Sequence, residues 1–382
     1  MPCRRVLLKS AAALVALSLA AAPATAQADE PIPVVASFSI LADMVERIGG
    51  EHVDVTMLVG PDGDAHVYQP TPAAARAVSD AEILVVNGLE FEGWMDRLIE
   101  ASGFKGVEVV ATNGIEPIAY EDEHTDHDDH DGHDHHGHAH AKQAEEDDHD
   151  HDHSHDHDHD HDGHAEKAEH EHHDHAGHDD HAGHDDHDHH GHDEHAEAGG
   201  HHHHHHGAYD PHAWQSLGNA VIYVDNITAA LAKADPENAA TFYENRAAYV
   251  AELEALDADI RAIIAGLPES RRTVVTSHDA FQYFGRDYGL TFLAPQGLST
   301  ESEASAKDVA RLIERIRDEG ITAVFIENIT DPRLLEQIAN ETGATIGGTL
   351  YPGALSGTGG PAPTYLDMMR HNATTLAQAL SS

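Results

Sequence analysis

The run Val34-Val35-Ala36-Ser37-Phe38, followed at once by residues 39–48, carries the clearest structural signal in this chain. The first five residues are mostly apolar and predict a buried strand. In the next ten, apolar side chains recur at helical spacing and Gly49-Gly50 closes the pattern, which predicts a helix. A strand that passes directly into a helix is the repeating unit of a parallel α/β sheet.

The same alternation continues outward through two separate regions of the chain. The first region predicts further strands at 52–59, 83–86 and 107–110, with helices at 71–81 and 92–101. The second predicts strands at 273–276, 291–293, 323–326 and 345–350, with helices at 280–288, 305–319, 332–342 and 365–380. We therefore expect an α/β protein with two lobes, each a small, mostly parallel sheet flanked by helices.

A long helical pattern from Pro236 to Ile264 separates the two regions. Its expected apolar stripe consists of Tyr243, Ala247, Val250, Leu253, Leu256, Ile260 and Ile264. At 1.5 Å per residue such a helix spans about 40 Å. It is either a crossover within one domain or a stiff backbone that joins both lobes and limits hinge motion between them.

The first 28 residues have the pattern of an export signal. Arg4, Arg5 and Lys9 precede an apolar run, and Ala26-Gln27-Ala28 fits a cleavage site. The apolar run is short for a membrane span, so a retained anchor is the weaker alternative. The paired arginines leave both the general and the twin-arginine export routes open. Because the only cysteine is Cys3, we expect neither disulfides nor thiolate ligands after cleavage.

Residues 121–206 contain all but five of the 39 histidines, with 30 acidic residues and two lysines. Imidazole is a common ligand for zinc, copper and nickel. With almost nothing apolar to bury, this tract should be disordered. It is either a soluble insert without a specific role or a flexible loop that captures zinc weakly near a tighter site. Acidification should remove its ions, because protons compete for imidazole with a pKa near ~6.5.

The formal net charge of −48 makes nucleic acid an unsuitable partner and cations suitable ones. Three of the five remaining histidines lie in turn-rich loops. His66 follows the strand at 52–59, His212 precedes a helix, and His278 ends the strand at 273–276. Ligands gather at the carboxyl ends of strands in open α/β sheets, so these imidazoles could meet in one cleft. His52 and His371 have no such context, and we expect them to be structural or solvated.

Each of the three loop histidines has a neighbouring carboxylate in sequence. Asp64, Asp210 and Asp279 could accept the second ring N–H and fix the tautomer that binds metal. The same residue types are also common helix caps, so both interpretations stay open at this point.

Four motifs give the chain a family resemblance. They are residues 60–70, the Asp210-Pro211-His212-Ala213-Trp214 run, the Ser277-His278-Asp279-Ala280-Phe281 run, and residues 364–372. Together they resemble the metal-specific solute-binding proteins of bacterial ABC importers (cluster A-I), and in particular the zinc-binding, ZnuA-like branch. The resemblance implies a metal site at the interface of two lobes joined by one rigid helix. It implies His66, His212 and His278 as ligands of Zn²⁺, since the manganese branch has a carboxylate at the position of His278.

One position departs from that pattern. Many relatives have an aspartate ligand where Gly353 stands here, and some have a glutamate where Ala65 stands. The candidates for a fourth ligand are therefore water, Asp64 and a histidine of the tract. Three protein ligands plus water is a stable arrangement for zinc.

The expected organisation follows from these patterns. A signal peptide (1–28) precedes an N-terminal lobe (29–120), the tract (121–206), the end of that lobe with the second ligand (207–234), the linking helix (235–267) and a C-terminal lobe (268–382). The resemblance implies a monomeric periplasmic protein that delivers Zn²⁺ to an inner-membrane ABC permease and its ATPase, and a periplasmic zinc chaperone is a further candidate partner.

Two functions other than import also suit these features. One is a periplasmic zinc buffer or metallochaperone, which the tract would equally suit. The other is a secreted zinc hydrolase, since three histidines and a water also form a catalytic zinc site. The chain has no His-Glu-x-x-His motif and no nucleophile motif, so we expect no enzyme activity.

Overall fold

A computed structural model describes residues 30–120 and 208–381 of the chain. These residues pack together as one unit. The expectations for the signal peptide and for the histidine-rich tract fall outside the described residues. None of the described helices is long and apolar enough to cross a membrane.

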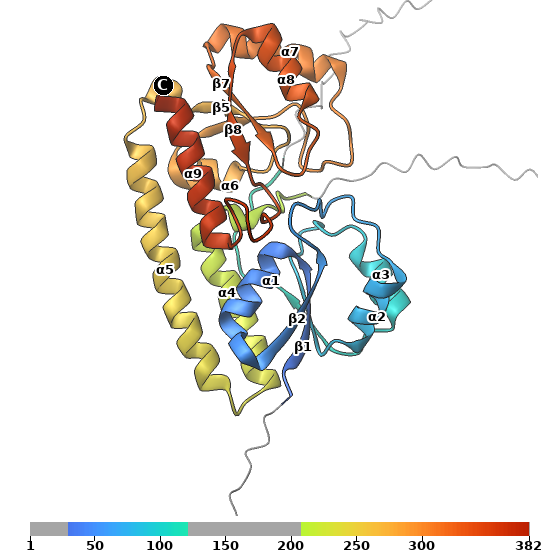
Figure 1. Ribbon diagram of the computed structural model, residues 1–382. Coiled ribbons are helices and arrows are strands. Elements are labelled where there is room, and N and C mark those ends of the chain that lie inside the picture. Colours follow the sequence, from blue (N-terminus) through green and yellow to red (C-terminus); the bar gives the residue numbers. More distant parts are fainter. Residues whose placement is uncertain (1–29, 121–207, 382) are drawn as a thin grey trace, which may run out of the picture. The chain divides into compact units, whose positions relative to one another are not determined.

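The first lobe is built on a four-stranded parallel sheet. Its strands are β1 (Ile32–Phe38), β2 (Val53–Val59), β3 (Ile83–Val86) and β4 (Val107–Val110), in the order β2-β1-β3-β4. Helices α1 (Ser39–Gly49) and α4 (Leu217–Ala234) cover one face, and α2 (Pro72–Asp80) and α3 (Met95–Ser102) cover the other (Figure 1). Because both faces are covered, β3 is buried throughout and β1 nearly so, as is typical of parallel sheets.

The second lobe repeats this plan. Its strands are β5 (Thr273–Val275), β6 (Thr291–Leu293), β7 (Ala323–Glu327) and β8 (Thr345–Leu350), in the order β6-β5-β7-β8. Its helices are α6 (Gln282–Tyr288), α7 (Ala306–Glu319), α8 (Arg333–Thr342) and α9 (Tyr365–Ser381). The prediction of two lobes, each with a parallel sheet flanked by helices, is therefore confirmed.

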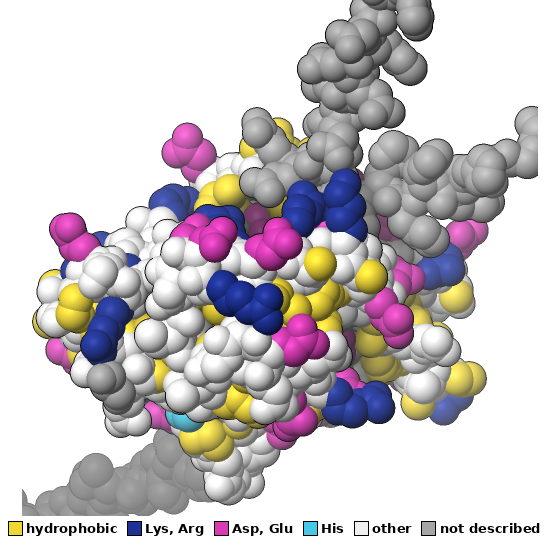
Figure 2. Space-filling view, turned by 90° about the horizontal axis from the view of Figure 1, so that it is seen from above, with side chains coloured by type: hydrophobic (Ala, Val, Ile, Leu, Met, Phe, Trp, Pro, Cys, Tyr) yellow, Lys and Arg dark blue, Asp and Glu magenta, His cyan; other side chains and the backbone are white. Residues whose placement is uncertain are grey.

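Three short 3₁₀ helices complete the fold: η1 (Gly50–His52), η2 (Ala213–Gln215) and η3 (Glu269–Arg271). On the face seen in Figure 2, basic and acidic side chains are interspersed with hydrophobic ones.

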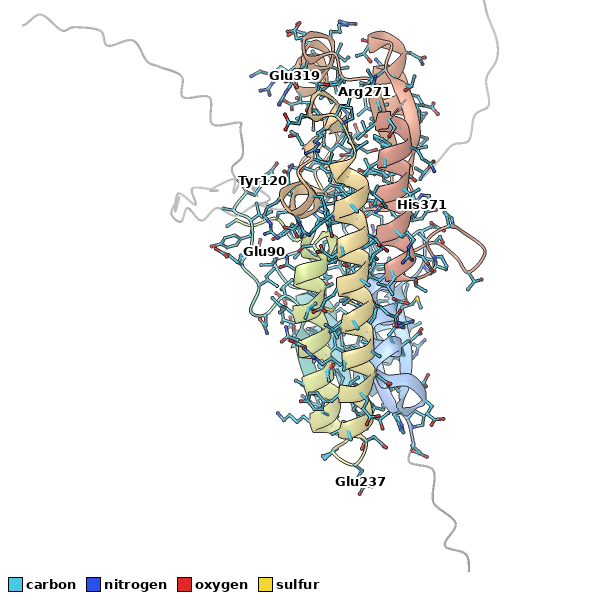
Figure 3. All side chains as sticks on the ribbon, turned by 90° about the vertical axis from the view of Figure 1, so that its left-hand side faces the viewer. Glu90, Tyr120, Glu237, Arg271, Glu319 and His371 are labelled. Carbon is cyan, nitrogen blue, oxygen red and sulfur yellow. The ribbon has the colours of Figure 1, made fainter. Side chains whose placement is uncertain are left out.

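Helix α5 (Ala239–Ala265) contacts helices of both lobes. It packs on α1 and α4 of the first lobe and on α6 and α9 of the second, and Figure 3 shows it lying between α4 and α9. Its buried side chains are Phe242, Tyr249, Leu253, Leu256, Ile260 and Ile264.

The expected stripe was wrong at the start of this helix. Tyr243 and Ala247 are exposed, whereas Phe242 and Tyr249 are buried. The position between the two buried aromatics is Asn245, whose Nδ2 donates to the carbonyl oxygen of Ile48 (2.8 Å). A polar residue that is satisfied by α1 therefore interrupts the apolar pattern and hides its true register.

Candidate metal centre

Three loops bring His66, His212 and His278 together. His66 follows β2, His278 follows β5, and His212 comes immediately before η2. The ring centroids are 5.3 Å apart for His66 and His212, 5.6 Å for His66 and His278, and 5.3 Å for His212 and His278. One ring nitrogen from each lies within 4.8 Å of the others. Within residues 30–120 and 208–381, this is the group of side chains with the geometry to hold a metal ion.

The spacing suits coordination of a single ion. The Nε2 atoms of His66 and His212 are 3.2 Å apart. Two nitrogens bound at ~2.0–2.1 Å to one tetrahedral zinc would be about 3.3–3.4 Å apart. A modest contraction of the set toward a common point would therefore place all three nitrogens at bonding distance.

The ring of His212 is fixed by Asp210. The Oδ1 of Asp210 accepts hydrogen bonds from Nδ1 (2.8 Å) and from the backbone N–H (2.9 Å) of His212. Because Nδ1 carries the proton, Nε2 is the nitrogen left with a free lone pair. Both side chains are fully buried, and burial raises the pKa of Asp210 to about 7 although the His212 N–H opposes this.

The ring of His278 is fixed by Glu327, the last residue of β7. The Glu327 Oε2 accepts from Nδ1 of His278 (2.6 Å), and its Oε1 accepts the backbone N–H groups of Ser277 (3.1 Å) and His278 (3.2 Å). The Nε2 of His278 is buried and has no hydrogen-bond partner among the described residues. An unsatisfied buried nitrogen is costly, and a metal ion would satisfy it.

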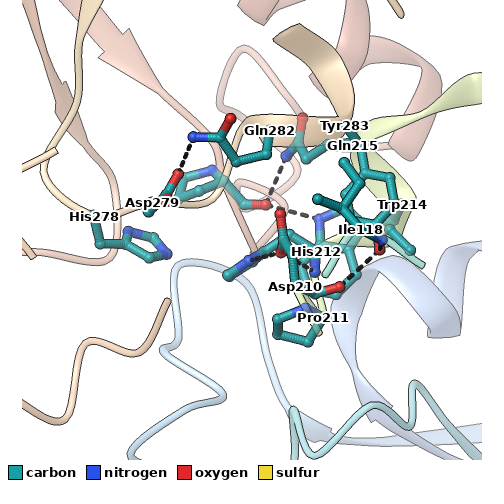
Figure 4. Close-up of polar contacts among 12 residues, drawn as sticks. Ile118, Asp210, Pro211, His212, Trp214, Gln215, His278, Asp279, Gln282 and Tyr283 are labelled. Carbon is teal, nitrogen blue, oxygen red and sulfur yellow. Dashed lines mark hydrogen bonds and ion pairs between the residues drawn. The ribbon is translucent and has the colours of Figure 1, made fainter. Parts of the chain in front are cut away.

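Glu327 is the functional residue that the sequence reasoning missed. Asp279 was the expected partner of His278, but its Oδ1 accepts instead from Nε2 of Gln282 (2.5 Å) (Figure 4). Strands β5 and β7 are neighbours, and the strand order reverses between them, which is where α/β sheets form ligand crevices. A charged residue that ends the apolar strand Ala323-Val324-Phe325-Ile326 was the signal available in the sequence.

Asp64 shapes the loop of His66 rather than its ring. Its Oδ1 accepts the backbone N–H of His66 (2.9 Å), and its Oδ2 accepts the hydroxyl of Thr300 in the second lobe (2.5 Å). Both oxygens are thus engaged, and Asp64 does not belong to the group of three. Of the three expected carboxylate partners, only Asp210 binds an imidazole ring.

The three imidazoles differ in how they hold protons. Burial, together with the charges of the other two rings, lowers the pKa of His66 well below its ordinary value. Burial and the charge of His278 do the same for the pKa of His212. Burial also opposes a charge on His278, but Glu327 outweighs it and raises the pKa of that ring. At neutral pH two rings are therefore ready to bind metal, and the third holds its proton more firmly.

Aromatic side chains form the floor of the site. The ring of Phe91 meets the ring of His66 edge-on at 4.7 Å, and Trp214 lies edge-on to His212 at 5.3 Å. Trp214 is held in turn by donation from Nε1 to the carbonyl oxygen of Pro352 (2.8 Å). An apolar floor lowers the local dielectric constant and strengthens binding of a cation that is fully coordinated.

The remaining positions of interest lie outside the cluster. His52 packs edge-on against Phe242, and Nε2 of His371 lies 3.0 Å from the carbonyl oxygen of Thr349. A Cβ built on Gly353 would contact Trp214 at 3.7 Å, so this segment packs behind His212. A cavity of about 1020 Å³ reaches His66, and its charged lining consists of Glu90, Glu92, Asp96, Glu108 and Glu301 together with Arg97.

The fold has two lobes, each with a parallel sheet, and loops at the strand ends bring three imidazoles together. This arrangement defines a metal-binding solute-binding protein. More particularly, the chain belongs to the ZnuA family: the family model, described as zinc-uptake complex component A, periplasmic, matches residues 34–379. Proteins of this family are periplasmic solute-binding components that work with the permease and ATPase of an ABC importer, and they are not enzymes.

The chain is similar to relatives that are named for different metals. The manganese-binding lipoprotein MntA of Halalkalibacterium halodurans is 28% identical over 94% of this chain and 91% of its own. The iron-binding protein YfeA of Yersinia pestis is 27% identical over 90% and 85%, respectively. The solved structure of a Mn-bound periplasmic metal-binding protein from Candidatus Liberibacter asiaticus is 25% identical, with a TM-score of 0.64 over 92% of this chain and 100% of that one. Similarity to these proteins therefore indicates that the chain binds a divalent metal, but it does not identify the metal.

Proposed function

We propose that this protein carries Zn²⁺ to its importer, and that His66, His212 and His278 bind the ion. The observation that supports zinc is the donor set: the group of three contains imidazoles only, with no carboxylate among them. Imidazole nitrogen suits zinc, whereas manganese favours oxygen donors.

Two carboxylates near the centre support this assignment, because each accepts a hydrogen bond from an imidazole ring. Asp210 and Glu327 each accept a hydrogen bond from an Nδ1–H group, which leaves Nε2 to face the other rings. Such outer partners orient a ring and raise its basicity as a ligand. We propose water as the fourth ligand, since Gly353 has no side chain and both oxygens of Asp64 are engaged.

We further propose that residues 121–206 capture zinc and raise its concentration beside the centre. Their composition supplies the ligands, and their attachment points support the location. The Tyr120 N–H donates to the Ala208 carbonyl (3.0 Å), and Ala119 pairs with Tyr209 as an antiparallel bridge. The described residues on either side of the tract are therefore paired with each other next to Asp210, and this tether supports a raised effective concentration of metal at the centre.

The test is a zinc titration of three proteins: the full chain, a variant lacking 121–206, and that variant with His66, His212 and His278 replaced by Ala. We expect many weak sites plus one tight site in the first, one tight site in the second and none in the third. His52→Ala is the matched control, because His52 lies outside the cluster. Submicromolar zinc binding by the triple variant would refute the proposed ligands.

Competition with Mn²⁺ and Fe²⁺ in the tract-deleted variant tests the choice of metal. We expect zinc to displace both ions when all are present at equal concentration. The ratio of zinc to manganese affinity should exceed the ratio typical of a site with mixed oxygen and nitrogen donors. Equal affinity for Mn²⁺ and Zn²⁺ would contradict zinc as the cargo while leaving the metal-carrying function in place.

A zinc buffer or metallochaperone is the second candidate, and the composition of the tract favours it as much as import. Capture of the permease by the zinc-loaded protein from detergent-solubilised membranes separates the two. We expect binding of one copy of the protein, as a monomer, to each importer. A protein that binds zinc and never associates with the permease would favour the buffer.

A further inference from the structure

We infer that the hydroxyl of Tyr283 positions His212 relative to His278 and thereby sets the metal affinity of the centre. Tyr283 lies on α6 in the second lobe and is fully buried. It is a positioning residue, because its hydroxyl contacts the backbone beside His212 and no imidazole. The inference rests on the proposed function, since it assumes that His212 and His278 bind the same ion.

The hydroxyl closes a ring of hydrogen bonds. It donates to the carbonyl oxygen of Asp210 (2.8 Å) and accepts the backbone N–H of Ile118 (3.1 Å) (Figure 4). The Asp210 N–H donates in turn to the carbonyl oxygen of Ile118 (2.9 Å). One side chain from the second lobe therefore holds the two segments that contain Ile118 and Asp210.

This ring of hydrogen bonds controls the orientation of His212, because Asp210 contacts Tyr283 through its backbone and His212 through its carboxylate. Its backbone belongs to the ring, while its carboxylate holds Nδ1 and the N–H of His212. On the first-lobe side, Nδ2 of Asn87 donates to the carbonyl oxygen of Pro211 (2.9 Å). The segment that carries His212 is thus anchored by Asn87 from one lobe and by Tyr283 from the other.

Tyr283 is also linked to the loop that carries His278. Helix α6 begins at Gln282, four residues after His278, and the side chain of Gln282 donates to Asp279 (2.5 Å). The Asp279 N–H donates to the carbonyl oxygen of Gly297 (3.1 Å), which ties this loop to the segment after β6. Tyr283 and His278 therefore move together, and the hydroxyl transmits the position of His278 to His212.

The test is Tyr283→Phe in the full chain, which keeps the buried ring and removes only the hydroxyl. Changes to residues that orient ligands typically weaken metal binding by about 10- to 100-fold, and we expect a zinc dissociation constant raised within that range. We also expect a changed visible absorption spectrum with Co²⁺ bound, because this spectrum reports the geometry of the ligands.

The matched control is Tyr288→Phe on the same helix. The Tyr288 hydroxyl donates to Oδ1 of Asp257 (2.9 Å), away from the histidines. We expect it to lower thermal stability and to leave zinc affinity and the Co²⁺ spectrum unchanged. Wild-type affinity in Tyr283→Phe, or equal weakening in both variants, would overturn the inference.

A third variant separates this inference from the proposed function. His212→Ala should abolish tight zinc binding if His212 is a ligand. If His212→Ala binds zinc as the wild type does, the proposed ligands are wrong, and Tyr283 has nothing to position. If His212→Ala fails to bind and Tyr283→Phe binds normally, only the inference about the hydroxyl is wrong.

Discussion

The buried Glu327 and the half-buried Asp279 are two carboxyl groups beside His278, and only Glu327 contacts its ring. We expect Glu327→Gln to weaken zinc binding by about 10- to 100-fold, because the ring loses the charge that orients it and raises its basicity. Isothermal titration with zinc measures the change. Asp279→Asn is the control: its Oδ1 still accepts from Gln282, so it should bind zinc nearly as the wild type does. Equal loss in both variants would mean that the charge of the pocket matters and the ring contact does not.

The unequal pKa values of the three imidazoles predict the pH dependence of binding. The pKa values of His66 and His212 are lowered, so both rings stay neutral as the pH falls below about 6.5. The pKa of His278 is raised, so this ring holds a proton that the metal must displace. In the tract-deleted variant, zinc affinity should fall about tenfold per pH unit between roughly pH 5.5 and 6.5, as for one displaced proton. A thousandfold fall per unit would mean that all three rings are protonated without metal.

The sequence located the histidines and the partner of His212, Asp210, but not the partner of His278. The three ligand candidates stand in turn-rich loops with recognisable neighbours, which is a local signal. Glu327 is 49 positions from His278 in sequence, and its contact exists only because β5 and β7 pair in the sheet. Contacts of this kind depend on strand order, and strand order is not written in any single motif.

Among the helices and strands, four of the eight described strands were predicted to the residue, and the other four differ by one or two residues at one end. Strands β3, β4, β6 and β8 begin and end where the pattern indicates. Helix α3 begins at Met95, three residues later than expected, because Glu92 belongs to the preceding loop and stabilises it through hydrogen bonds. The carboxylate of Glu92 accepts the N–H groups of Asn87 (2.7 Å) and Gly88 (3.2 Å) and the hydroxyl of Ser37 (2.6 Å). This loop passes through left-handed conformations at Gly88, Leu89 and Glu90, which no helix tolerates.

The start of α9 gives a prediction for stability. The Oδ2 of Asp43, on α1, accepts the backbone N–H of Tyr365 (3.0 Å), and burial raises the pKa of Asp43 to about 6. Folding therefore disfavours the charged form of Asp43. The cost of burying this charge lowers stability at pH 7.5, and it disappears as the pH falls through about 6, the pKa in the folded state, toward 3.8, the pKa in the unfolded chain. We expect Asp43→Asn to raise the free energy of unfolding at pH 7.5 by about 1–2 kcal/mol and to have little effect near pH 4.

Urea denaturation at the two pH values measures this effect. Asp235→Asn provides a control of opposite sign, because Asp235 is only half-buried and hydrogen bonds from Asn238 lower its pKa. That substitution should not stabilise the protein at pH 7.5. A loss of stability in Asp43→Asn at pH 7.5 would mean that the charge on Asp43 favours the end of α9 more than its burial costs.

At the scale of the whole described unit, α5 limits how far the lobes can separate. It packs against α1 and α4 on one side and α6 and α9 on the other, so a wide hinge opening would break contacts along its length. We expect small-angle scattering profiles of the tract-deleted protein with and without zinc to superpose. A marked decrease in the radius of gyration on zinc binding would instead indicate hinge closure of the kind seen in other binding proteins.

The two-stranded base formed by Ala119 and Tyr209 has an evolutionary consequence. Because the chain leaves and returns at adjacent positions, the fold does not depend on how many residues lie between them. Doubling such a connection costs only about 0.6 kcal/mol of closure entropy. Duplications or deletions of histidine-rich repeats can therefore accumulate here with little effect on folding. In the function proposed above, such changes would alter how much metal residues 121–206 capture, while the three histidines of the centre stay as they are.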